Sequence, residues 1–408
     1  MLHNNNEITK ELCMNYILIK NGLIFDFETK NYIKKDILIE DNKIKTIKDN
    51  IDFDDKNLKI IDAEENYVLP GLVDCHTHIG ILEECTGKLG YDNNETSNPI
   101  TPNLRAIDGV NPLDVAFKDA IKAGVTTLMT GPGSNNPIGG LNIVMKTYGN
   151  IIDNMVVKSP SGLKIAFGED PISIYGKNQK CPVTRMGIAA LIRETFLKAQ
   201  DYMMQKEKGK IDQRDAKLEA IVPVLKGDII LRAHAHRADD IVTAIRIAEE
   251  FNINKLIIEH GTEAHIIKDY IREKGVSVAF GPMLTPRIKM ELKLRHYASS
   301  LELCEAGVRM ALITDHPYNS IDQFRAIAAL AVSEGLCEAD ALRFITSNPA
   351  EMLDCGDKLG SLKEGFDADI VIYNDNPLNI MSKVLVTIIN GKIVYTKQNV
   401  SEHLSFIN

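Results

Sequence analysis

The 408-residue sequence lacks the features of a membrane protein, a nucleic-acid binder or a secreted protein. No apolar run reaches the roughly 18 residues of a membrane-spanning helix, so no membrane span is expected. The N-terminal 22 residues lack a basic region followed by an apolar segment, so no secretory signal is expected. Lysine and arginine total 47 against 56 acidic residues, and the net charge of −9 argues against a nucleic-acid partner.

Cysteine is sparse, and several common motifs are missing. Seven scattered cysteines contain no CxxC pair, which indicates reduced thiols in a cytoplasmic protein rather than a disulfide framework or a zinc knuckle. The absence of GxSxG disfavours a serine nucleophile. The glycine-rich segment 131–140 lacks the Lys-Ser/Thr of a phosphate loop, so we expect a flexible loop and no nucleotide binding.

Both ends of the chain have the texture of short strands. Segments 16–27, 36–47 and 59–70 carry β-branched residues and the turn dipeptides Asn21-Gly22 and Asp41-Asn42. The same texture returns at 367–375 and 384–397, where Asn390-Gly391 predicts a hairpin turn. Neither end alone offers enough strands for a stable sheet. We therefore predict a small β-sandwich domain built from residues 1–67 and 359–408.

The middle of the chain, residues 68–358, alternates apolar runs with amphipathic helical segments. Three of the predicted helices span 113–123, 238–251 and 322–334. The eight candidate strands are 71–78, 124–131, 142–149, 162–169, 229–236, 255–261, 276–282 and 310–317. This order predicts a (β/α)₈ TIM-like barrel in the α/β class. The long polar stretches 84–112 and 170–187 are expected to be loops at its catalytic rim.

Histidines gather where the predicted barrel strands end. His76 and His78 are two residues apart and should face one side of a strand. The other polar residues at strand ends are His234, His236, His260, Asp315 and His316. A barrel places its active site at the C-terminal ends of its strands. Burying so many polar groups would be costly unless a divalent cation lay among them. Imidazole and carboxylate ligands suit zinc first, with iron or manganese as alternatives.

The chain contains, in order, the motifs LPGLVDCHTH, RAHAH, IEHG and LITDHP and the segment from Ser347 to Leu378. In these motifs it resembles the amidohydrolase superfamily of metal-dependent hydrolases, in its imidazolonepropionase-like branch. The resemblance covers nearly the whole chain. It implies the barrel, one or two divalent metal ions and hydrolysis of a small-molecule substrate, but it names no substrate and leaves assembly into a homo-oligomer open.

The resemblance also assigns metal ligands. It makes His76 and His78 the first-strand ligands, and it matches His234, His260 and Asp315 to the fifth, sixth and eighth strands. His236 should lie nearer the rim, where it handles substrate or protons or supports other residues. His316 is expected to be structural, because it should point away from Asp315.

The fourth-strand ligand has two candidates. Many relatives use a lysine carboxylated by CO₂, and Lys164 is positioned like that lysine. Glu169 is positioned like the glutamate of adenine-deaminase-like relatives, and it lies at the catalytic end of the strand. The two are five residues apart, so a regular strand would send them to opposite faces. We predict Glu169 as the ligand.

In the loop that follows, Tyr175 and Arg185 are candidate substrate contacts. Arg185 could clamp a substrate carboxylate, or it could be a solvated surface residue.

The predicted reaction is hydrolysis of a carbon–nitrogen bond in an amide, peptide or cyclic amide. A metal-activated water would attack, with Asp315 as general base and then general acid. Deamination of a ring amine on the same site is the alternative. A non-catalytic relative that has lost its ligands is the third reading, and the filled ligand positions argue against it.

Overall fold

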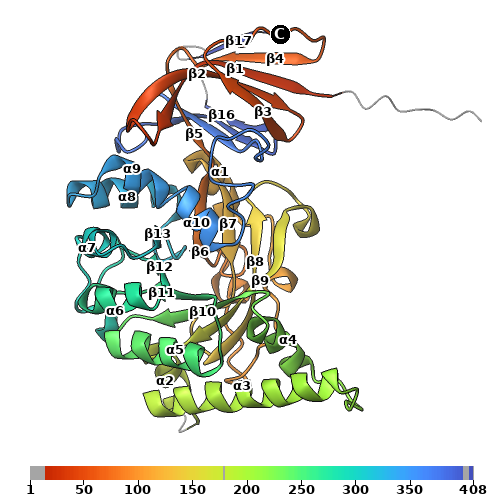
Figure 1. The fold of residues 1–408 in the computed structure, drawn as a ribbon, viewed down its shortest axis with the longest axis vertical. Helices are drawn as coiled ribbons and strands as arrows, with labels where there is room; N and C mark the ends of the chain where they lie inside the picture. Colours follow the sequence, from red (N-terminus) through yellow and green to blue (C-terminus); the bar gives the residue numbers. More distant parts are fainter. Residues whose placement is uncertain (1–13, 178–179, 398–403, 408) are drawn as a thin grey trace, which may run out of the picture.

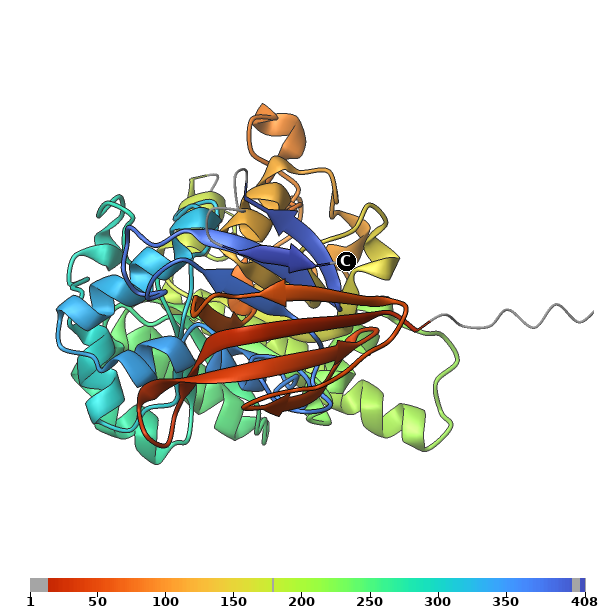
Figure 2. The same ribbon diagram turned by 90° about the horizontal axis from the view of Figure 1, so that it is seen from above.

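The computed structural model describes residues 14–177, 180–397 and 404–407. A barrel with surrounding helices forms one body, and a sheet built from both ends of the chain lies against it (Figures 1 and 2). This arrangement confirms the predicted fold class. Within the described ranges, no helix is long and apolar enough to cross a membrane.

The chain-end sheet has nine strands among the described residues, in the order β16-β15-β14-β5-β1-β2-β3, with β4 and β17 attached beside β1. The strands are β1 (Tyr16–Asp26), β2 (Asn31–Glu40), β3 (Lys43–Lys48), β4 (Leu58–Asp62), β5 (Tyr67–Pro70), β14 (Ile370–Tyr373), β15 (Val384–Ile389), β16 (Lys392–Thr396) and β17 (Ser405–Ile407). The two chain ends join where β5 pairs antiparallel with β14. Because β1 pairs with β4 along its first half and with β5 along its second, the sheet folds over a shared core (Figure 1).

Two of the three predicted turns lie between strands. Asp41 and Asn390 both have positive φ angles and connect β2 to β3 and β15 to β16. The predicted turn at Asn21-Gly22 is wrong. The chain continues through it as β1, and the dipeptide forms a β-bulge that absorbs an extra residue against β2.

The barrel contains all eight predicted strands, side by side in the order β13-β12-β11-β10-β9-β8-β7-β6. They are β6 (Leu72–Thr77), β7 (Val125–Thr130), β8 (Ile138–Lys146), β9 (Val156–Ala166), β10 (Ile230–Ala235), β11 (Leu256–His260), β12 (Ser277–Phe280) and β13 (Met310–Leu312). The barrel closes between β13 and β6. Just after β13 ends, the Asp315 N–H donates to the carbonyl of His76 in β6 (3.1 Å).

One strand departs from the predicted parallel barrel. β8 runs antiparallel to both β7 and β9. The connection between β7 and β8 is residues 131–137, which is too short for the helical crossover that parallel neighbours need. This connection stays at the rim, and Gly133, Ser134 and Asn135 line the central cavity.

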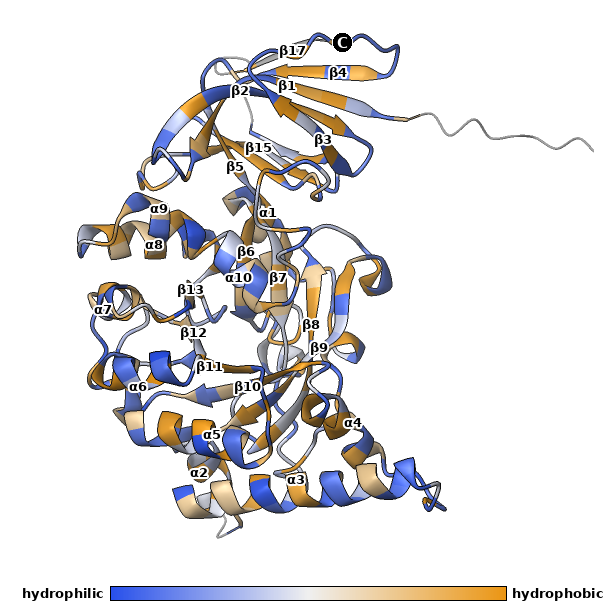
Figure 3. Cartoon of the chain, viewed as in Figure 1, coloured by the Kyte–Doolittle hydropathy of each residue, from blue (hydrophilic) through white to orange (hydrophobic). Residues whose placement is uncertain are grey.

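Helices cover the outside of the barrel, with apolar residues facing the strands and hydrophilic residues facing outward (Figure 3). The α-helices are α1 (Val115–Ala123), α2 (Glu169–Gly176), α3 (Arg185–Glu207), α4 (Ala216–Leu225), α5 (Ala238–Glu250), α6 (Lys268–Glu273), α7 (Ser299–Glu305), α8 (Phe324–Ser333), α9 (Glu338–Arg343) and α10 (Ser347–Met352). Short 3₁₀ turns are η1 (Gly87–Gly90), η2 (Ala106–Asp108), η3 (Ile152–Asn154), η4 (Ala264–Ile267), η5 (Met290–Leu292) and η6 (Ile321–Gln323). The three predicted helices correspond to α1, α5 and α8.

The two predicted rim loops have different outcomes. The stretch 84–112 is mostly irregular, and its Asn93 and Asn94 line the cavity. The stretch 170–187 is not simply a loop, because α2 occupies its first part and α3 begins at Arg185. The polar composition of this stretch fits the many exposed or half-buried residues of α2 and of the first turn of α3.

Candidate metal centre

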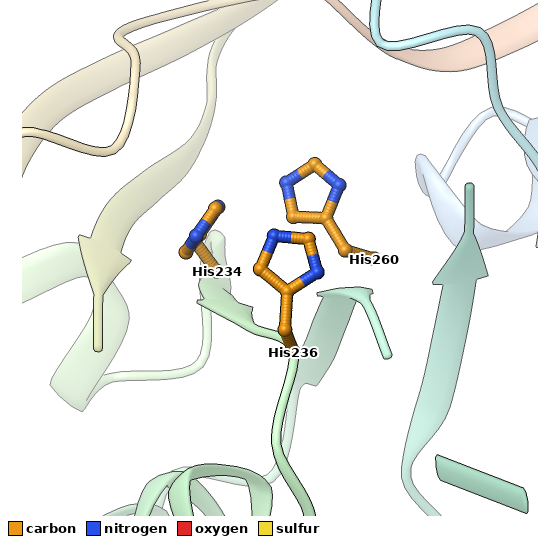
Figure 4. Close-up of side chains that lie close together, drawn as sticks. All are labelled: His234, His236 and His260. Atoms are coloured by element: carbon orange, nitrogen blue, oxygen red, sulfur yellow. The ribbon is translucent and has the colours of Figure 1, made fainter. Parts of the chain in front are cut away.

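Side chains from five barrel strands converge on one cavity. His78 follows β6, Lys164 belongs to β9, and His234 and His236 lie at the end of β10. His260 ends β11, and Asp315 follows β13. Figure 4 shows how the rings of His234, His236 and His260 approach one another; their centroids are 4.5 to 4.8 Å apart.

His76 and His78 face the same carboxylate oxygen. Asp315 Oδ1 lies 3.1 Å from Nε2 of His76 and 3.4 Å from Nε2 of His78. The alternation of a strand predicts this, since residues two apart point to the same side. The ring of His76 also lies 5.0 Å from that of His260. The structure therefore gathers five of the six predicted metal ligands: His76, His78, His234, His260 and Asp315.

Hydrogen bonds to the outer ring nitrogens fix how several imidazoles point. Nδ1 of His78 donates to the Gly131 carbonyl (2.7 Å), and Nδ1 of His260 donates to the Gly281 carbonyl (2.9 Å). A proton on Nδ1 leaves Nε2 as a lone-pair donor, the usual arrangement of metal-binding histidines. His236 is held through Nδ1 by the Thr262 hydroxyl (2.8 Å).

Burial keeps most of these imidazoles neutral. It lowers the pKa of His234 to about 4 and holds the pKa values of His236 and His260 well below the ordinary value. Burial also acts to lower the pKa of His76, but the Glu259 and Asp315 carboxylates together outweigh burial and raise it. Burial alone would raise the pKa of Asp315, but His260, His76 and His78 hold it well below its usual range. Neutral imidazoles beside an ionised carboxylate are the protonation states that a divalent metal requires.

Two observations indicate that this site is built for a metal. His234 is 2% exposed, and neither ring nitrogen makes a well-aligned hydrogen bond; its Nε2 only lies 3.2 Å from Asp170. Such buried polar atoms are costly unless a ligand satisfies them. The backbones of His260 (φ 74°) and Asp315 (φ 55°) adopt left-handed conformations that favour glycine. Such strain persists at functional sites, where it costs about 1–3 kcal/mol for each residue.

A network of buried charges lies beneath the histidines. Glu259 is 0% exposed and makes a very short contact with the Lys164 ammonium group. Its other oxygen lies 2.7 Å from Nε of Arg232 and 2.9 Å from Nδ1 of His76. Arg232 also donates to the Cys75 carbonyl (2.6 Å). Glu259 therefore orients His76 and compensates two buried cations.

The structure does not place Glu169 with the histidines. The left-handed Gly168 (φ 83°) turns the chain after β9, and Glu169 begins α2. The Glu169 side chain lines a neighbouring cavity with Arg185 and Glu291. Lys164, which belongs to the fourth barrel strand β9, lines the central cavity instead. We predicted Glu169 because it was expected at the catalytic end of the strand, but β9 ends at Ala166 and Glu169 follows the turn at Gly168 into the neighbouring cavity.

The two predicted substrate contacts also lie outside the cavity wall. Arg185 pairs with Asp240 (3.0 Å) and Glu291 (2.9 Å) at the start of α3. Tyr175 is buried and donates to the Asn136 amide oxygen (2.6 Å), which anchors the connection before β8. Both residues support the rim, and their positions do not suit direct contact with a substrate in the central cavity. His316 is buried, as expected of a structural residue, and its Nδ1 accepts from the Ile321 N–H (3.1 Å).

Three residues of the site were missed by sequence reasoning. Asp170 and Lys289 line the cavity and form an ion pair (2.8 Å). Glu259 precedes His260 directly, so a charged residue inside an apolar strand was its available signal. Asp170 directly follows Glu169, the predicted ligand, so its place next to a candidate ligand was the available signal. Nothing in the local sequence marks Lys289.

Comparison with known proteins identifies relatives of this arrangement. The Amidohydrolase family matches residues 67–394. The crystal structure of an amidohydrolase from Thermotoga maritima MSB8 is 42% identical, with a TM-score of 0.90, and the match covers 93% of this chain and 100% of that one.

Two curated proteins are more distant relatives. Amidohydrolase tasK of Hapsidospora irregularis is 28% identical over 363 residues, which are 81% of this chain but 37% of that protein. The chain therefore spans little more than a third of the tasK protein. A 5-methylthioadenosine/S-adenosylhomocysteine deaminase of Carboxydothermus hydrogenoformans is 25% identical, and the match covers 89% of this chain and 85% of that protein.

The family match covers far more than half of the chain, and the Thermotoga structure agrees in sequence as well as in fold. The predicted resemblance is confirmed, and with it the broad class of a hydrolase that acts on carbon–nitrogen bonds. The chain belongs to the amidohydrolase family.

Proposed function

We propose that this protein hydrolyses an amide, peptide or cyclic amide bond rather than deaminating a ring amine. The observation that carries the proposal is the position of Lys164, which is fully buried and lines the cavity among the histidines while Glu169 lies elsewhere. Among relatives, a fourth-strand lysine is typical of the dipeptidase-like and cyclic-amidase-like branches. A glutamate is typical of the adenine-deaminase-like branch.

The metal ligands that we propose are Lys164 in its carboxylated form and the five residues His76, His78, His234, His260 and Asp315. Zinc is the proposed metal, because imidazole and carboxylate ligands suit it. When bound, such a metal supplies Lewis acidity, which polarises the scissile carbonyl and makes a water molecule easier to deprotonate. We also propose that the protein is cytoplasmic.

Asp315 is the proposed proton carrier. Its low pKa keeps the carboxylate ionised at neutral pH, so it can accept a proton from the attacking water. The same carboxyl group then delivers that proton to the leaving nitrogen. His236 lines the cavity with Nδ1 engaged by Thr262, so its Nε2 is the atom available to the substrate. We propose that His236 binds the carbonyl oxygen or moves a proton there.

Deamination is the second candidate, and the name of the Carboxydothermus relative favours it. It would use the same residues, with ammonia as the leaving group. A non-catalytic role is disfavoured because the predicted ligands on the first, fifth, sixth and eighth strands are all present.

The test is a substrate screen on zinc-loaded protein with N-acyl amino acids, dipeptides, cyclic ureides and aminopurines. We expect hydrolysis in the first three groups. Ammonia release from aminopurines without any amide hydrolysis would overturn the proposal in favour of deamination. The mass of the intact protein, measured with and without bicarbonate, checks the lysine separately. Carboxylation adds the elements of CO₂, about 44 Da, a difference that routine instruments resolve easily.

A further inference from the structure

The ion pair between Lys289 and Asp170 lies on the wall of the catalytic cavity. Lys289 Nζ is 2.8 Å from Asp170 Oδ2, and both side chains are about one-fifth exposed. Within the described ranges, the cavity wall contains two lysines and no arginine. Lys164 is engaged by Glu259 deep in the barrel. Lys289 is therefore the permanent cation that a ligand entering the cavity can reach.

Asp170 holds Lys289 in place but does not occupy all the hydrogen-bond donors of its ammonium group. Oδ2 of Asp170 accepts from Ser134 Oγ (2.7 Å) and from Lys289, and lies 3.2 Å from Nε2 of His234. An ammonium group has three donors. The contact with Asp170 accounts for one of them, so Lys289 retains donors for a ligand.

The segment that carries Lys289 is clamped to the barrel. Glu291 Oε1 accepts from the Glu169 N–H (2.8 Å) and from Arg185 (2.9 Å). The Glu291 side chain is 3% exposed. Two contacts, Lys289 to Asp170 and Glu291 to Glu169, thus join the segment after β12 to the start of α2. A fixed cation loses little freedom when it binds a ligand, which strengthens binding.

Apart from the histidines, Lys164 and the carboxylates Asp170 and Asp315, the rest of the wall is uncharged, so Lys289 is the point at which an anionic group would bind. Asn93, Asn94, Asn135, Thr285 and Tyr318 are uncharged, and Ile288, Leu292 and Pro282 are apolar. We propose that Lys289 is a specificity-determining residue that binds a carboxylate of the substrate, so that the enzyme prefers amides bearing a free carboxylate to their neutral counterparts. This inference rests on the proposed function, because it names the substrate class of that same site. Open-chain N-acyl amino acids and carboxylated cyclic ureides share the required chemistry.

The test compares matched compounds on the zinc-loaded full-length protein. N-acetyl amino acids, dipeptides and a carboxylated cyclic ureide are each paired with the corresponding neutral carboxamide. We expect higher kcat/KM for the acids. Lys289→Met should lower kcat/KM for the acids by roughly 10- to 100-fold more than for the amides, mainly through KM, as expected for loss of a hydrogen bond to a charged group. Lys289→Arg should retain most of the preference.

Lys293→Met is the matched control, since Lys293 lies four residues further along and lines the neighbouring cavity. We expect this variant to behave as wild type. Equal cleavage of acids and amides by wild type, or an equal loss on both in Lys289→Met, would overturn the inference. Which of the two acid classes is cleaved identifies the source of the carboxylate.

Calorimetry on the same pairs separates this inference from the proposed function. If nothing is hydrolysed but acids bind more tightly than amides, and Lys289→Met removes the difference, the carboxylate site stands and the proposed reaction fails. If acids and amides bind equally, or neither binds, the carboxylate site is refuted.

Discussion

Replacing Glu259 with glutamine should destabilise the protein more than any surface change of the same kind. Glu259 is the one carboxylate in contact with both Lys164 and Arg232 among the described residues, and its side chain is 0% exposed. Glutamine keeps the size but removes the charge. In the metal-free protein, where Lys164 is not carboxylated, two buried cations would then lack a counter-charge, and His76 would lose the acceptor that lies 2.9 Å from its Nδ1.

The magnitude follows from the cost of an uncompensated buried charge. Removing one partner of a buried ion pair costs about 3–5 kcal/mol. Because Glu259 serves two cations, we expect the upper part of that range. Whole proteins are stable by only about 5–15 kcal/mol, so the loss should be obvious in a denaturant unfolding curve. Loss of the carboxylate that orients His76 should also weaken metal binding by roughly 10- to 100-fold.

Glu250→Gln is the matched control for this prediction. Glu250 forms a two-pronged pair with Arg193 on the surface (2.5 and 2.8 Å), where the side chains are 39% and 32% exposed. Solvent screens such a pair, so its loss should cost less than about 1 kcal/mol. Both variants are compared by urea unfolding of metal-free protein and by zinc titration.

The double variant Glu259→Gln/Lys164→Met tests the cause. Removing the cation together with its partner should cost less than the sum of the two single changes, because one uncompensated charge disappears. A loss below about 1 kcal/mol in Glu259→Gln, or strict additivity in the double variant, would refute the reasoning.

Three further outcomes are expected. Lys164→Ala should lower the metal content measured by elemental analysis after dialysis, whereas Glu169→Gln should leave it unchanged; the reverse result would restore Glu169 as the ligand. Asp315→Asn should keep the fold and much of the metal affinity but abolish turnover, and a near-wild-type rate on any identified substrate would contradict its role as base. Burial lowers the pKa of His316 from 6.5 to about 4, so the unfolded chain binds more protons between these values and stability falls as pH drops from 6.5 to 4. His316→Gln should remove up to about 3 kcal/mol of that pH dependence in unfolding curves at pH 7 and pH 4.

Several features of the fold and the site were predictable because local patterns of residues determine them. The apolar runs that became β6, β10 and β11 were recognisable because buried strands must be apolar over most of their length. The spacing of His76 and His78 was enough to place both rings on one side, since strand alternation is a local property. The strand-end histidines then indicated a single site, because strand ends in a barrel meet at one rim.

The direction of β8 was harder to predict. Its composition suits a buried strand in either direction, and the deciding feature was the seven-residue connection before it. We predicted a parallel strand because the overall alternation of strands and helices favoured a regular barrel. The turn at Asn21-Gly22 failed for a related reason, since a dipeptide with positive φ serves a bulge as well as a turn.

The barrel, the composite sheet and the group of histidines with Asp315 were thus predictable, because each depends on periodicity or on where a strand ends. The choice between Lys164 and Glu169 needed the folded chain, in which the left-handed turn at Gly168 separates the two side chains. The folded chain alone paired Lys289 with Asp170, 119 residues away, and placed Glu259 between two buried cations. Contacts of this kind depend on which strands become neighbours when the barrel closes. No local pattern of residues shows which distant segments will meet.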